Sequence, residues 1–164
     1  MPYQTVDAST FSGGSSSHLI KGVKIYPVLS RKHVLGTVHY AQNPPVGGPH
    51  NPIPQTCGIY DTPVQNEHAV HSLEYGAVWI TYRPGLSSSE ITTLKNLVRG
   101  HDHVLLSPYP NLPAPVVASA WGVQLQLQSA SDPRLVQFIN QYEEGSQAPE
   151  SGAPCSGAFG TPSE

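Results

Sequence analysis

The chain has 164 residues, of which 12% are charged, and its formal net charge is −3 with histidine neutral. This length is enough for one domain with its own hydrophobic core. No basic cluster indicates a nucleic-acid surface, and no apolar run approaches the ~20 residues that a membrane-spanning helix needs. We therefore expect no nucleic-acid partner and no transmembrane segment in this chain, which also shows no signal peptide.

The first third of the chain combines a polar tail, short strands and a long irregular loop. Residues 1–17 are small and polar and predict a flexible N-terminal linker or tail, which leaves residues 18–164 as a single domain. Alternating residues predict strands near 22–28 and 33–40. Five prolines and three glycines prevent regular structure between residues 41 and 58. The low charge of this stretch favours an ordered loop.

The run GAVWITYRP at residues 76–84 predicts the central strand of a sheet, because it is apolar, β-branched and aromatic. Side chains alternate along a strand, so we expect Val78 and Ile80 on one face and Trp79 on the other. Further strands are predicted at residues 103–109 and 116–128, the second as one long strand or as two broken at Gly122.

Two helices are expected in the second half of the chain, at residues 86–100 and 131–145. Ser87 and Glu90 form a capping box at the start of the first helix. Glycines at the end of each segment are the predicted stops. Together these elements predict an α+β fold: a mainly antiparallel sheet with two helices packed on one face, and long Pro/Gly-rich ordered loops.

The segment QNEHAVHSLEYG, residues 65–76, carries the main functional signal. His68, His71 and Glu74 are spaced by three residues, which places them on one face if the segment is helical. Neutral imidazoles and carboxylates are the usual ligands of zinc, copper and iron. The opposing interpretation is an exposed His68, a hydrogen-bonded His71 and a Glu74 that caps backbone amides. The residues alone leave both open.

Other histidines are candidates to join this group. His39 ends a predicted strand, and His50 lies in the Pro/Gly loop ahead of Cys57. Eight histidines against eight lysines and arginines favour metal binding. The only methionine is Met1, so the thioether clusters of many cuprous-ion carriers are absent.

Two non-metal alternatives use the same segment. In an enzyme, His71 would act as a general base, Glu74 would orient it and Tyr75 would be the acid or electrophile. In a structural or interaction module, the histidines would only fix the loop onto the sheet. The sequence contains no nucleophile elbow and no phosphate-binding glycine loop, so a binding role is favoured over catalysis.

Two cysteines, Cys57 and Cys155, lie far apart and outside any C-x-x-C motif. They are either two reduced thiols or one disulfide that ties the C-terminal tail to the N-terminal half. A disulfide would imply an oxidising compartment.

The stretches NPPVGGPH, CGIYD, QNEHAVHSLEYGAVWITYRP, SPYP and SAWG resemble the domain-of-unknown-function 3105 family, from about Gly22 to Cys155. The resemblance implies an extracytoplasmic domain, cell-surface or secreted, and a disulfide between Cys57 and Cys155. It matches His50, His71 and Glu74 to residues of the family pattern. Tyr75 departs from that pattern, because the family has histidine there, and His68 is a candidate to compensate.

Family members also occur beside copper-handling proteins, so the resemblance implies such a protein as a partner. The combined expectation is an extracytoplasmic metal-binding domain for sequestration or delivery, with copper favoured over zinc. The expected ligands are His50, His71 and Glu74, with His68, His39 or Tyr75 nearby.

Overall fold

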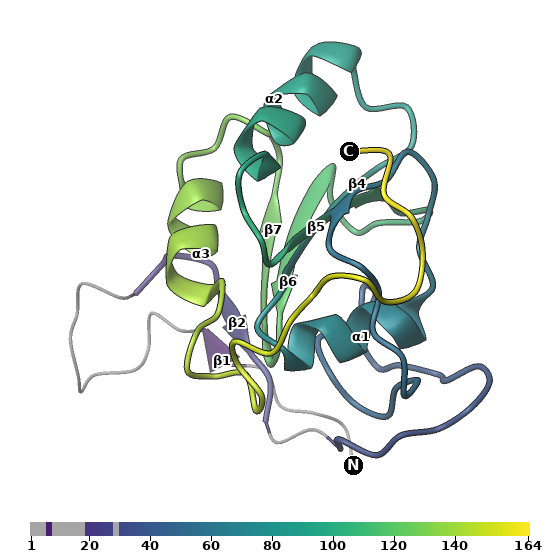
Figure 1. Ribbon diagram of the computed structural model, residues 1–164. Coiled ribbons are helices and arrows are strands. Elements are labelled where there is room, and N and C mark those ends of the chain that lie inside the picture. The colour runs from purple at the N-terminus through teal and green to yellow at the C-terminus, as the bar shows by residue number, and fades with distance from the viewer. Residues whose placement is uncertain (1–5, 8–18, 28–29) are drawn as a thin grey trace.

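The computed structural model describes residues 6–7, 19–27 and 30–164 (Figure 1). The linker predicted at residues 1–17 lies outside this part of the chain, apart from two residues that form a short strand. Val28, in one of the predicted strands, also lies outside it. Within the described ranges, no helix combines the length and the apolar character needed to span a membrane.

The strands are β1 (Val6–Asp7), β2 (Lys24–Ile25), β3 (Gly58–Ile59), β4 (Val78–Tyr82), β5 (Val104–Pro108), β6 (Val116–Ala120) and β7 (Val123–Leu127). These strands of the described residues form one mixed sheet in the order β1-β2-β7-β6-β4-β5-β3. Strand β5 pairs in parallel with both β3 and β4, whereas β4 pairs antiparallel with β6. The prediction of a mainly antiparallel sheet is therefore wrong. A helix between β4 and β5 brings the chain back to run in the same direction, as a parallel crossover requires.

Three helices of the described residues cover the sheet, namely α1 (Asn66–Glu74), α2 (Ser88–Val98) and α3 (Arg134–Tyr142). Helices α2 and α3 pack on one face, where Phe138 shares a core with Val78 and Ile80. Helix α1 lies apart from them (Figure 1) and packs on the opposite face, where Leu73 shares a second core with Trp79. The predicted division of the central strand between two faces is thus confirmed, whereas the prediction of only two helices on one face is wrong.

Helix α1 escaped prediction because most of its surface is buried and much of that surface is polar. His68, His71, Ser72 and Glu74 are all buried along with its apolar residues. A helix that is buried nearly all round lacks the simple apolar stripe by which amphipathic helices are recognised. The predicted helix α2, in contrast, begins with the expected cap, because the Ser87 hydroxyl accepts from the backbone N–H of Glu90 at 3.3 Å.

The strand predicted at residues 33–40 does not form. Only His33 pairs there, in an isolated parallel bridge with His50. The chain then bends at Gly36, which has a φ of +87° and therefore ends an extended run.

The loop at residues 41–58 is ordered, as predicted, and its backbone is bonded to helix α1. Asn51 N–H donates to the Glu67 carbonyl at 3.1 Å, and Gln55 N–H donates to the His68 carbonyl at 3.0 Å. These two bonds fix the loop that carries His50 against the helix that carries His71.

Candidate metal centre

Four side chains from three segments converge beside helix α1. They are His33, His50, His71 and Glu74, and their ligand atoms all lie within 4.8 Å of one another. The imidazole centroids are 4.8 Å apart for His50 and His71, 5.0 Å for His33 and His50, and 5.1 Å for His33 and His71. Three imidazoles and one carboxylate form a donor set typical of a transition-metal site.

The two buried imidazoles are held by their Nδ1 atoms. Nδ1 of His50 lies 2.8 Å from the Gly48 carbonyl, and Nδ1 of His71 lies 2.7 Å from the Asn51 carbonyl. A carbonyl accepts only, so each Nδ1 carries the proton and each Nε2 carries the free lone pair. Histidines that bind metals are usually oriented in this way, by a hydrogen bond from the other ring nitrogen to a carbonyl or carboxylate.

The Nε2 atom of His50 is buried and has no hydrogen-bond partner among the described residues. It lies 3.7 Å from Oε1 of Glu74, whose side chain is 3% exposed. An unpaired buried polar atom costs roughly 1–3 kcal/mol, so native structures rarely keep one without a reason. A cation at this point would give Nε2 a partner.

Burial lowers the pKa of both His50 and His71, although their hydrogen bonds to the Gly48 and Asn51 carbonyls oppose this shift. Both rings are therefore neutral at neutral pH. Only a neutral imidazole offers a lone pair to a metal, so the environment already favours the ligand form.

Glu74 is oriented by Arg31. The Arg31 Nε atom lies 3.1 Å from Oε2 of Glu74, and its Nη2 lies 3.3 Å from Oε1 of Glu150. This pairing occupies one carboxylate oxygen and leaves the other, Oε1, facing His50. The enzyme alternative required Glu74 to orient His71, but the Nδ1 of His71 is bonded to the Asn51 carbonyl instead.

The ligand atoms would bind a metal ion after moving slightly closer together. Metal–nitrogen bonds near 2.0–2.1 Å place tetrahedral ligand atoms roughly 3.3 Å apart. The separation of 3.7 Å between His50 and Glu74 is close to that value. The ligand atoms of the four residues lie up to 4.8 Å apart, so they must move closer together to coordinate one ion.

The structure brings together three of the six residues that the sequence indicated, namely His50, His71 and Glu74. Tyr75 lies beside them with its ring edge-on to His71, at 4.7 Å between centroids. Burial and the carboxylates of Glu150 and Glu74 raise the pKa of the Tyr75 hydroxyl, which disfavours a phenolate ligand.

His68 and His39 lie outside the cluster. The His68 ring stacks on Phe159, with centroids 3.8 Å apart, and its Nδ1 lies 2.6 Å from the Ile53 carbonyl. These contacts tie the loop to the C-terminal segment. His39 is exposed.

His33 is the cluster member that the sequence interpretation missed. It opens the segment in which a strand was predicted, and only its pairing with His50 brings it to the site. The local sequence shows a histidine there, but no local pattern reveals that non-local pairing.

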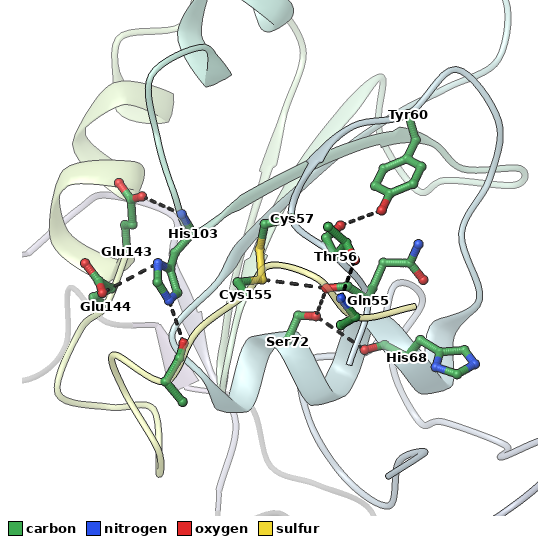
Figure 2. The surroundings of a disulfide bond; sticks show 12 residues. Gln55, Thr56, Cys57, Tyr60, His68, Ser72, His103, Glu143, Glu144 and Cys155 are labelled. Atoms are coloured by element: carbon green, nitrogen blue, oxygen red, sulfur yellow. Dashed lines mark hydrogen bonds and ion pairs between the residues drawn. A yellow bond between two sulfur atoms is a disulfide. The ribbon is translucent and has the colours of Figure 1, made fainter. Parts of the chain in front are cut away.

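Cys57 and Cys155 form a disulfide, with their Cα atoms 5.3 Å apart (Figure 2). The bridge joins the end of the His50 loop to the C-terminal segment. The backbone supports it, because Cys57 N–H donates to the Cys155 carbonyl at 2.7 Å. The predicted bridge is thus present in the fold.

The fold and the cluster define an α+β domain with a mixed sheet and a candidate site for a transition metal on one of its faces. The chain belongs to the family described as "Protein of unknown function (DUF3105)", whose model matches residues 33–157. The match includes both cysteines and all four cluster residues. Comparison with curated proteins and with solved structures gives no significant match.

Proposed function

We propose that this protein binds one transition metal ion, with cupric copper favoured over zinc, outside the cytoplasm. The ligands would be His50, His71, Glu74 and His33, and the role would be metal sequestration or delivery. The observation that carries the proposal is the buried Nε2 of His50, which has no partner among the described residues and faces a carboxylate and two further imidazoles.

The donor set supports cupric copper or zinc over cuprous copper. Three nitrogens and one carboxylate oxygen are borderline to hard donors, whereas cuprous ions favour thiolates and thioethers. Both cysteines are bridged, and the only methionine is Met1. Among divalent ions, nitrogen and oxygen sites generally bind Cu²⁺ more tightly than Zn²⁺.

The disulfide supports a non-reducing compartment. Disulfides persist in secreted and cell-surface proteins and are rare in the reducing cytosol. A non-reducing compartment favours the cupric over the cuprous ion, and imidazole ligands suit the cupric ion.

A structural role is the second candidate, and one observation favours it. The Nδ1 atoms of His68 and His71 both bond to carbonyls of the loop, at Ile53 and Asn51. In this alternative the histidines only fix the loop to helix α1, and added metal has no effect on the protein. The Nε2 atom of His50 argues against it, because it has no hydrogen-bond partner among the described residues and most buried polar atoms are paired.

Equilibrium dialysis with elemental analysis at neutral pH tests the proposal. We expect about one copper ion per chain for the natural protein. The matched variant His50→Asn keeps a donor near Nδ1 for the Gly48 carbonyl but has no counterpart of Nε2. It should therefore lose the ion while remaining folded. A copper and zinc content below about a tenth of an ion per chain in the natural protein would overturn the proposal.

A further inference from the structure

The four candidate ligands differ in how firmly they are held. His50, His71 and Glu74 are all buried. Each is fixed from outside the cluster, by Gly48, Asn51 and Arg31 respectively. His33 alone is exposed, and its ring makes no hydrogen bond to any residue that the structure describes.

This difference has a consequence for ligand exchange. Moving a buried ligand would break its orienting hydrogen bond and leave polar atoms without water, which costs roughly 1–3 kcal/mol for each. Rotating an exposed imidazole away breaks no orienting hydrogen bond and leaves no polar atom without water. Exposed side chains also change rotamer within picoseconds to nanoseconds. His33 is therefore the ligand whose bond to an ion is easiest to replace.

The main chain near His33 keeps that motion local. His50 N–H donates to the Lys32 carbonyl at 3.0 Å, and Val34 N–H donates to the His50 carbonyl at 2.8 Å. These bonds hold the backbone on both sides of His33 against the buried half of the site. The side chain can thus leave an ion while its backbone stays in place.

We propose that His33 is the exchange ligand through which the metal passes to or from a partner that offers an imidazole. The inference rests on the proposed function and specifies the delivery role. In the first step of transfer the bond from the ion to the His33 nitrogen breaks, and a bond from the ion to the partner's imidazole nitrogen forms. The bonds to His50, His71 and Glu74 break afterwards, as the partner supplies further ligands. The oxidation state of the ion does not change, so no electron is transferred.

The alternative is that His33 is an ordinary fourth ligand, no different in effect from His71. The two histidines make a matched pair, because both are imidazole members of the cluster and differ mainly in burial. His39 provides the control, since it is also exposed and lies on the same segment but outside the cluster.

Copper transfer to a Gly-Gly-His peptide in stopped flow tests the proposal. The full chain, loaded with one equivalent of cupric ion, is mixed with excess peptide, and the absorbance of the copper–peptide complex is followed. We expect a rate that rises in proportion to peptide concentration. His33→Ala should still bind one ion, more weakly than the natural protein does, and should transfer it about tenfold faster or more.

The controls separate the outcomes. His39→Ala should transfer copper at the natural rate, and His71→Ala should fail to retain a full equivalent. If His33→Ala transfers at the natural rate, or loses the ion as His71→Ala does, the exchange role is wrong while the metal site stands. If the natural protein itself retains no copper, the proposed function is wrong and the exchange role is wrong with it.

Discussion

Replacing both Cys57 and Cys155 by alanine is expected to lower the free energy of unfolding by up to about 4.7 kcal/mol. The bridge closes a loop with a sequence separation of 98 residues. In the chain-entropy model a loop of that length removes about 16 cal/mol/K from the unfolded chain, which corresponds to about 4.7 kcal/mol at 25 °C. For a protein of this size, the loss is equivalent to a fall in Tm of roughly 10–20 °C.

Thermal unfolding followed by circular dichroism measures this fall. The control is the natural protein reduced with dithiothreitol, which removes the bridge but keeps both cysteine side chains. The two samples should agree, because the effect comes from the unfolded chain rather than from packing around the buried Cys155. A fall in Tm below about 3 °C in the reduced natural protein would refute the entropic reasoning.

Three further predictions concern Tyr75, His68 and strand β4. Tyr75→His should tighten copper binding in calorimetric titration by more than the ~10–100-fold typical of outer-shell changes, because an imidazole beside His71 needs no deprotonation. Equal affinities with a lower Tm would mean that the Tyr75 ring only packs there. His68→Ala should leave copper affinity unchanged but lower the free energy of unfolding in urea by about 1–3 kcal/mol, since the contacts with Ile53 and Phe159 are lost, and a loss of the ion would contradict this. Hydrogen exchange should be slowest at the amides of Val78–Tyr82, whose side chains are all buried, and fast exchange there would contradict its central position.

Elements with strong local signals could be predicted from the sequence. Helix α2 has its cap at Ser87, and strand β4 is a continuous apolar run, so each is specified by neighbours in the chain. The parallel pairing of β3 with β5 depends instead on two strand residues, Gly58 and Ile59, that meet a distant partner. A two-residue strand carries no periodic pattern, so this pairing could not be inferred.

Helical geometry explains why the site was only partly predicted. Each residue turns an α-helix by about 100°. A step of three therefore falls about 60° short of one full turn, and a step of six falls about 120° short of two full turns. His71 and Glu74 therefore share a face, while His68 and Glu74 diverge. The structure accordingly places His68 against Phe159 rather than in the cluster.

His33 and His39 illustrate the limit set by non-local pairing. The segment was predicted as one strand, which would have carried both histidines along a straight path. The bend at Gly36 lets His33 remain beside His50 while His39 leaves the site. Which residue of a long loop pairs with which distant residue depends on the assembled fold, so the sequence could not assign His33 to the site.

Anomalous X-ray scattering from a crystal of the natural protein soaked in cupric salt tests whether the cluster binds copper. We expect one strong copper peak at bonding distance from His50 and His71, with Glu74 and His33 completing the coordination. Data from His50→Asn crystals soaked in the same way should lack that peak. A copper peak elsewhere in the natural protein, for example between His101 and Glu143, with none beside His50, would contradict the account.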